Sequence, residues 1–255
     1  MKHNPALDES KCIGCGSCVK DCVANHIVLN EGKVSFTAGN CIGCGHCEAI
    51  CPTHAMTVDG FEEEPVEISE QTRLDPETLL KAIQTRRSIR QFKNQPVPEE
   101  VLKMILEAGR LAPTGGNSMS NGFIVVKDCL LEAEEAAVKL FRGGFNVVKN
   151  FSKSYRSMNV DDHFFFKGAP CAIVVTGNNV NGSLAAENMA FMAEAYGLGV
   201  LYSGFFTMAC EMSGKVKELL KIESDEKMVT TLVLGYPAVK YHRTVRREKG
   251  RIRRV

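Results

Sequence analysis

The chain has 255 residues, and its 44% hydrophobic and 24% charged content is ordinary for a globular protein with a buried core. Its formal net charge of +1 gives no overall field that would attract nucleic acid or an acidic partner. No apolar run approaches the roughly 18 residues that cross a bilayer, and residues 1–10 lack the apolar core of a secretion signal. We therefore expect a soluble, cytoplasmic protein with no membrane or nucleic-acid partner.

Eleven cysteines are present, and eight of them lie before residue 52. They form two copies of the spacing C-x2-C-x2-C-x3-C, and the second copy starts 29 residues after the first. Without a secretion signal, so many cysteines indicate metal binding rather than a disulfide framework. The cysteines of the two copies are Cys12, Cys15, Cys18 and Cys22, then Cys41, Cys44, Cys47 and Cys51.

Residues 10–58 resemble a bacterial two-cluster ferredoxin, in which three cysteines of each copy hold one 4Fe–4S cluster and the fourth crosses to the other. One departure is that Val23 follows the fourth cysteine of the first copy, where the second copy has Pro52. The alternative is a pair of structural zinc sites, because two C-x2-C pairs can hold zinc. The resemblance implies that Cys12, Cys15, Cys18 and Cys51 ligate one cluster and that Cys41, Cys44, Cys47 and Cys22 ligate the other.

Between the two cysteine copies, a short hairpin is expected over residues 26 to 36, around Asn30-Glu31-Gly32. The rest of the chain divides into a connecting segment and a larger domain. We predict a ferredoxin-like domain over residues 1–60, an acidic linker over 61–74 and a second domain over 75–255.

The second domain should begin with a helix, since Asp75 can cap it and Pro76 suits its first turn. Another helix is expected after Pro98, and a mostly apolar one over residues 183–196. Residues 123–127, 171–176 and 228–234 read as strands. The mixture predicts an α+β fold rather than strict βαβ alternation.

At the end of the first helix of this domain stands Arg86-Arg87-Ser88-Ile89-Arg90. Three arginines and a hydroxyl can grip a phosphate through charge-assisted hydrogen bonds. A basic helix end can equally be a solvated cap, so this run alone leaves both interpretations open. No G-x-G-x-x-G is present, so a Rossmann dinucleotide site is not supported.

Two further motifs follow in order: Ala112-Pro113-Thr114-Gly115-Gly116-Asn117-Ser118, then Gly197-Leu198-Gly199 with Ser203-Gly204-Phe205. With the arginine run, they make residues 76–245 similar to the nitroreductase family of flavin mononucleotide (FMN) proteins. The resemblance implies an α+β sandwich that forms a homodimer, with FMN at the subunit interface.

The resemblance also implies roles for individual residues. It assigns the FMN phosphate and ring to Arg86, Arg87, Ser88 and Arg90. Asn117 and Ser118 match the loop that reaches FMN from the other subunit; after them this chain has Met119-Ser120-Asn121 where many members have Gln-Pro-Trp. Ser203 and Gly204 match the stretch whose backbone N–H groups face the flavin ring, and Arg243 is a second candidate phosphate contact.

Together these features predict an FMN-dependent oxidoreductase in which a reduced carrier loads two 4Fe–4S clusters, which pass electrons to FMN and then to a small organic acceptor. The acceptor classes expected are a nitro compound, a quinone or an enone-like molecule. Two alternatives are a nitroreductase driven by NAD(P)H with accessory clusters, and a non-catalytic electron carrier or redox sensor. No catalytic acid is identified.

Phe164-Phe165-Phe166 could line a pocket but fits core packing better. Cys129, Cys171 and Cys210 are expected to be core residues.

Overall fold

The computed structural model describes residues 3–39, 41–148 and 159–255. The chain forms two compact units. Unit 1 contains residues 1–74 together with Thr114–Ser118, and unit 2 contains Asp75–Pro113 and Met119–Val255. The division therefore falls directly before Asp75, and a short loop of the larger domain clusters with the cysteine-rich part.

Unit 1 is built from short elements around its cysteines. Two antiparallel strand pairs form its framework, β1 with β4 and β2 with β3. The second pair is the predicted hairpin, and Gly32 takes φ 77° in its turn. The elements are β1 (Pro5–Leu7), α1 (Ser17–Asp21), β2 (Ile27–Asn30), β3 (Lys33–Phe36), α2 (His46–Ala49), β4 (Met56–Val58) and the 3-10 turns η1 (Glu70–Thr72) and η2 (Gly115–Asn117).

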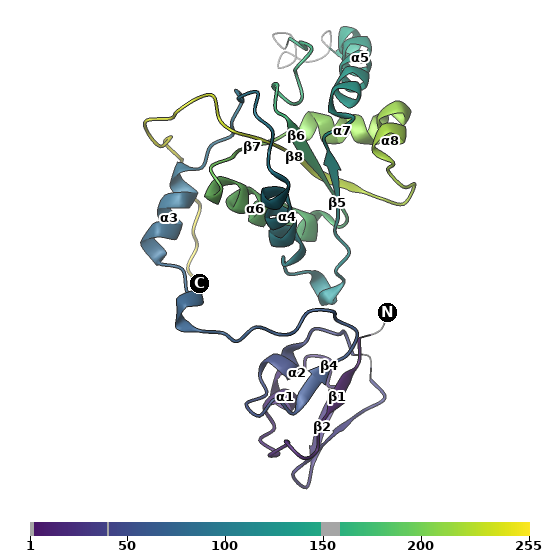
Figure 1. Ribbon diagram of the computed structural model, residues 1–255, viewed down its shortest axis with the longest axis vertical. Coiled ribbons are helices and arrows are strands. Elements are labelled where there is room, and N and C mark those ends of the chain that lie inside the picture. The colour runs from purple at the N-terminus through teal and green to yellow at the C-terminus, as the bar shows by residue number, and fades with distance from the viewer. Residues whose placement is uncertain (1–2, 40, 149–158) are drawn as a thin grey trace. The chain divides into compact units, whose positions relative to one another are not determined.

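Unit 2 has one four-stranded antiparallel sheet in the order β5-β6-β8-β7 (Figure 1). Its predicted α+β character is confirmed. The elements are α3 (Pro76–Thr85), α4 (Glu99–Arg110), β5 (Gly122–Val126), α5 (Leu130–Val148), β6 (Cys171–Thr176), α6 (Asn179–Ala195), β7 (Gly199–Tyr202), α7 (Gly204–Met212), α8 (Gly214–Leu220) and β8 (Met228–Gly235).

The sheet has a separate apolar core on each face, because side chains alternate along a strand. Every residue of β6 is buried. Ile173 and Val175 pack with residues of α4 and α6, whereas Ala172 and Val174 pack with residues of α5, α7 and α8. This explains why β6 reads as a continuous apolar run instead of an alternating one.

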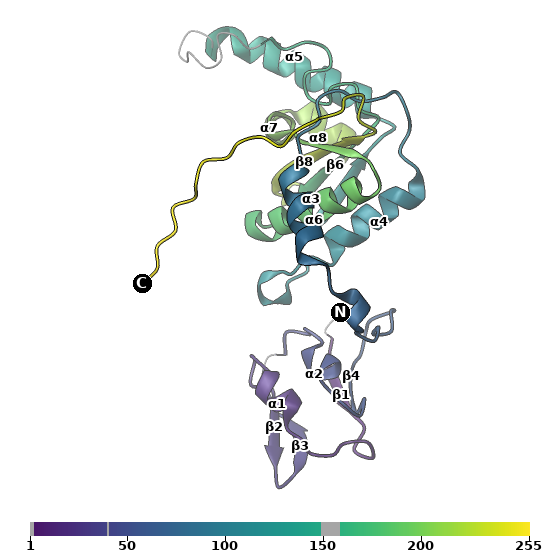
Figure 2. The ribbon, with the colours of Figure 1, turned by 90° about the vertical axis from the view of Figure 1, so that its left-hand side faces the viewer.

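Helix α3 begins at the predicted cap, with the Thr78 N–H donating to Asp75 Oδ2 at 2.8 Å. Three of its apolar side chains stay partly exposed: Leu79, Leu80 and Ile83 are 40%, 54% and 51% exposed. Figure 2 shows α3 and the extended C-terminal tail of unit 2. No helix among the described residues has the length and apolarity that a bilayer crossing requires.

The aromatic run at residues 164–166 packs in the core, as predicted. Phe165 and Phe166 are 1% and 0% exposed, and both rings contact Phe206. Part of the segment over residues 143–167, which contains this aromatic run, lies outside the described residues.

Replacing Phe206 with alanine should lower the free energy of unfolding by about 3–5 kcal/mol, because the side chain is fully buried and its removal leaves a cavity. Chemical denaturation would measure the change. Leu131, which is 62% exposed, is the control. A Phe206→Ala effect no larger than that of Leu131→Ala would contradict this packing.

Candidate functional site: two cysteine clusters and an arginine-rich segment

The eight N-terminal cysteines gather around two small, mostly apolar cavities in unit 1. Each cavity takes three cysteines from one copy of the repeat and the fourth from the other. One is lined by Cys12, Cys15, Cys18 and Cys51, and the other by Cys22, Cys41, Cys44 and Cys47. We call these the first and second cysteine sites.

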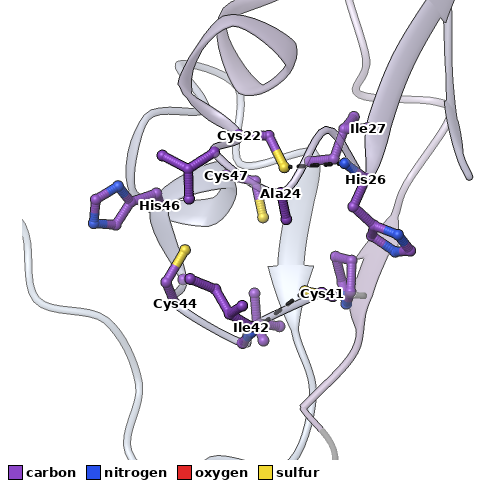
Figure 3. A pocket seen from close by; sticks show the side chains of 14 residues that line it. Cys22, Ala24, His26, Ile27, Cys41, Ile42, Cys44, His46 and Cys47 are labelled. Atoms are coloured by element: carbon purple, nitrogen blue, oxygen red, sulfur yellow. Dashed lines mark hydrogen bonds between the residues drawn. The ribbon is translucent and has the colours of Figure 1, made fainter. Parts of the chain in front are cut away.

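In Figure 3 the four cysteines of the second site lie around one shared space. The ring of His46 points away from that space, and its Nδ1 lies 3.1 Å from Asp21 Oδ2. His26 also lines the cavity. His46 Nδ1 therefore contacts the exposed Asp21 carboxylate, and the ring is turned away from the sulfur atoms.

Glycines allow the tight turns of both cysteine loops. Gly14, Gly16, Gly43 and Gly45 all have φ between 62° and 72°, a region that side chains with a Cβ rarely adopt. At Gly14 a Cβ would come within 2.5 Å of the Gly32 carbonyl oxygen. A substitution there would disturb the loop that carries the first site.

Backbone N–H groups point at sulfur in both sites. Ala55 donates to Cys51 Sγ at 3.2 Å, while His26 donates to Cys22 Sγ and Gly43 to Cys41 Sγ, both at 3.4 Å. Such bonds stabilise the negative charge that thiolate ligands carry.

The thiols do not share one electrostatic environment. Burial raises the pKa of Cys47 to about 11, and burial also raises the pKa of Cys18. A hydrogen bond with the Ser17 hydroxyl lowers the pKa of Cys15. If Cys47 ligates a metal, binding would have to supply the free energy that deprotonates it at neutral pH.

The donor set suits iron–sulfur clusters, since each site offers four thiols and an apolar wall. Within the described residues, no three Cys, His, Asp or Glu side chains converge on a position for a single metal ion.

The Asn117 loop lies in unit 1, beside the second site. Asn117 Nδ2 donates to the carbonyl oxygens of Ile42 at 3.1 Å and Gly43 at 2.9 Å. Asn117 has φ 52°, a left-handed conformation that asparagine tolerates better than most residues. The FMN contacts expected of Asn117 and Ser118 from the other subunit stay predictions.

In unit 2 the arginine-rich segment, residues 86–90, runs beside β7. Ser88 forms a parallel bridge with Val200, and the Ile89 N–H donates to the Val200 carbonyl at 2.9 Å. Gly199 permits this approach, because a Cβ there would lie 2.4 Å from Ile89 Cγ1. The chain thereby places Arg86, Arg87, Ser88 and Arg90 next to the strand that leads into Ser203 and Gly204.

Arg86 is held by α6 and β7. Its Nε lies 3.8 Å from Glu187 Oε1, and its guanidinium lies 5.8 Å from the centre of the Tyr202 ring. The Tyr202 hydroxyl donates to Glu187 Oε2 at 2.7 Å. Burial raises the pKa of Glu194, although the charge of nearby Arg86 opposes that shift.

Two guanidinium nitrogens in this segment are suited to a further anion. Arg86 Nη1 and Arg87 Nε are buried and have no hydrogen-bond partner among the described residues. Orphaned buried donors are costly, and a phosphate would satisfy them. The other Arg87 nitrogens donate to the carbonyls of Arg86 and Gln84, so Arg87 also caps α3. The interpretation of the arginine run as a helix cap therefore applies to the two Arg87 nitrogens that bond these carbonyls.

Ser203 is buried and its backbone N–H already donates to the Thr231 carbonyl at 2.8 Å. Its hydroxyl donates to the Phe165 carbonyl at 3.0 Å. Gly204 is the first residue of α7, where N–H groups lack an intrahelical acceptor. Gly204 therefore retains the better backbone donor for a flavin. Arg243 is exposed in the C-terminal tail, and within the described part of the chain it forms no hydrogen bond or ion pair.

Sequence reasoning missed Glu187, Glu194 and Tyr202. A signal was present: Glu187 and Glu194 are the only charged residues of α6, and they are seven positions apart in an otherwise Ala- and Met-rich helix. Residues at that spacing share one helix face, so the sequence indicates a helix face with two carboxylates, whereas their position near Arg86 follows from the tertiary packing.

Cys171 and Cys210 are fully buried, as expected, and burial raises the pKa of each to about 12. Both should stay protonated and resist iodoacetamide at pH 8, because the thiolate is the reactive form. Mass spectrometry of the native protein should find them unlabelled, and labelling should appear after unfolding. Labelling of both in the native state would contradict their burial.

Two family profiles match the chain. The nitroreductase family profile matches residues 83–236, and the profile of the 4Fe–4S dicluster domain matches residues 4–52. The chain belongs to the nitroreductase family, whose oxidoreductase domain here follows an N-terminal dicluster domain.

Three relatives illustrate the similarity. A candidate NADH dehydrogenase/NAD(P)H nitroreductase of Methanothermobacter thermautotrophicus is 28% identical over 170 residues, which is 63% of this chain and 78% of the relative. A nitroreductase with bound FMN from Desulfitobacterium hafniense is 26% identical with a TM-score of 0.57, covering 68% of this chain and 97% of that one. An FMN-bound nitroreductase of Bacteroides fragilis, at 24% identity and TM-score 0.56 over 69% of this chain and 98% of its own, shares the fold.

Proposed function

We propose that this protein is an FMN-dependent oxidoreductase in which electrons pass from a reduced carrier to two 4Fe–4S clusters, then to FMN, and then to a small organic acceptor. The observation that carries the proposal is the grouping of eight cysteines into two four-cysteine sites on a chain whose other unit belongs to the nitroreductase family. Acceptor classes that suit flavin chemistry are nitro compounds, quinones and enone-like molecules.

The pairing of the two cofactors has a chemical reason. Iron–sulfur clusters exchange single electrons, whereas a flavin accepts one or two and can deliver a hydride equivalent. Joining both in one chain raises their effective concentration for each other. The protein would thus collect single electrons and release them in pairs.

The chain's own residues supply binding and orientation for FMN. Arg86, Arg87 and Ser88, with Arg90, are the residues that we propose to hold the phosphate, supported by the two orphaned guanidinium nitrogens. The Gly204 N–H at the start of α7 is proposed to face the ring. The Ser203 N–H already donates to the Thr231 carbonyl oxygen. Ser203 is therefore proposed to contribute the position of its backbone and not a hydrogen bond to the ring.

We further propose a homodimer with FMN at the subunit interface. The exposed apolar residues of α3, Leu79, Leu80 and Ile83, support it. An amphipathic helix normally buries such a stripe. Sedimentation of the purified protein should give twice the 28.0 kDa chain mass.

The proposal is tested by purifying the protein without oxygen and measuring iron, sulfide and FMN per chain. We expect about eight iron, about eight sulfide and about one FMN. Zinc in place of iron would overturn the cluster half, and failure to bind FMN after reconstitution would overturn the flavin half.

A second candidate is a nitroreductase driven directly by NAD(P)H, with the clusters as accessories; the name of the Methanothermobacter relative favours considering it. Stopped-flow mixing with NADH and NADPH separates the two. Rapid flavin reduction by either nucleotide, equal with and without clusters, would favour the second candidate. A non-catalytic carrier or sensor would be favoured if no acceptor supported more than one turnover.

A further inference from the structure

The peptide group that joins Ile42 to Gly43 is hydrogen-bonded at both ends. Its carbonyl oxygen accepts from Asn117 Nδ2 at 3.1 Å, and its N–H donates to Cys41 Sγ at 3.4 Å. Asn117 Nδ2 also donates to the next carbonyl, that of Gly43, at 2.9 Å. One amide side chain is thus connected through one peptide to a sulfur of the second cysteine site.

A donor at the carbonyl end of a peptide polarises the whole group and strengthens the N–H at its other end. A stronger N–H···S bond places more positive charge near the sulfur, which favours a cluster that has gained an electron. Hydrogen bonds to sulfur are among the features that set cluster potentials.

The first site offers an internal comparison. The corresponding peptide there joins Ile13 to Gly14, and within the described residues no side chain donates to either carbonyl. Instead the Gly32 carbonyl oxygen approaches Gly14, where a Cβ would come within 2.5 Å of it. The two loops share their sequence pattern, but among the described residues only the second accepts hydrogen bonds from an asparagine side chain on its backbone carbonyls.

We propose that Asn117 is a positioning residue that raises the reduction potential of the second cluster relative to the first, acting through the Ile42–Gly43 peptide. This inference rests on the cluster ligation proposed above. It gives Asn117 a role toward an iron–sulfur cluster, in addition to the FMN contact that the family resemblance implies.

Asn117→Gly is the decisive variant, because glycine removes both donors and accepts the left-handed backbone at φ 52° without strain. The matched control is Asn121→Gly, whose side chain donates to the Asn181 carbonyl at 3.3 Å and not to a cysteine loop. Asn117→Ala provides a second donor-free variant.

The measurement is an anaerobic redox titration of the purified holoprotein, followed by the contact-shifted NMR signals of the cysteine β protons, which report each cluster separately. Each cluster gains one electron on reduction. We expect the reduced-to-oxidised ratio of the second cluster at a fixed potential to fall roughly threefold in Asn117→Gly, which is about 30 mV because tenfold is about 59 mV for one electron. The first cluster and the Asn121→Gly protein should be unchanged.

Two results would overturn the inference: an unaltered second-cluster potential in both Asn117 variants, or an equal shift of both clusters. Iron and sulfide analysis of the same samples distinguishes this from failure of the proposed function. Wild-type protein without iron would refute the ligation itself, whereas intact clusters with unshifted potentials would refute only the role of Asn117.

Discussion

Replacing Cys22 with alanine should abolish the second cluster and spare the first, although Cys22 belongs to the first copy of the cysteine repeat. Cys22 lines the same cavity as Cys41, Cys44 and Cys47. A cluster that loses one of four thiolates is exposed to loss of iron, so iron per chain should fall from about eight to about four. Anaerobic iron and sulfide analysis measures the loss.

Alkylation followed by mass spectrometry identifies which site is lost. In Cys22→Ala the cysteines of the second site should become labelled, while Cys12, Cys15 and Cys18 stay protected. Cys51→Ala should give the reverse pattern, since Cys51 lines the first site. Cys129→Ala, outside both sites, should keep all the iron. Labelling that follows the copies of the repeat instead of the cavities would contradict the crossed arrangement.

Replacing Arg86 with alanine should weaken FMN binding by roughly tenfold to 150-fold, since a hydrogen bond to a charged group contributes about 1.5–3 kcal/mol. Arg86 has a buried, unpartnered Nη1 in the arginine-rich segment. Fluorescence titration of the apoprotein with FMN measures the dissociation constant.

The control is Arg110→Ala, because Arg110 is 51% exposed and pairs with Glu107 on the same helix. It should bind FMN like the wild type. The circular dichroism of the apoproteins verifies that both variants are folded. Unchanged FMN affinity in folded Arg86→Ala would show that Arg86 serves only its contacts with Glu187 and Tyr202.

Local signals in the sequence predicted much of the fold. The cap at Asp75, the strand over residues 171–176 and the hairpin around Gly32 are each encoded within a few neighbouring residues, and all three are present. Helix α6 starts at Asn179, four residues before the predicted start, because Asn178 caps it. The sequence reading did not predict α5, or the pairing of β1 with β4, which joins residues about fifty positions apart.

The candidate site was likewise predictable where its sequence pattern is local and not where its contacts join distant residues. Cysteine spacing is a local pattern that supports the resemblance to a two-cluster ferredoxin, and that resemblance implied the two sets of four that line the two cavities. The contact of Asn117 with Ile42 and Gly43 joins positions more than seventy residues apart, and a motif cannot encode it. Likewise Glu187 meets Arg86 only because β7 and α6 pack beside the arginine-rich segment.

In the proposed mechanism, electrons reach FMN through the clusters. Stopped-flow absorbance of the anaerobic holoprotein, mixed with a substoichiometric reduced carrier, tests it directly by following the broad cluster absorption and the flavin band together. We expect the clusters to bleach first and to regain absorbance as the flavin band disappears. Loss of the flavin band while the clusters stay oxidised, or clusters that stay reduced beside an oxidised flavin, would contradict it.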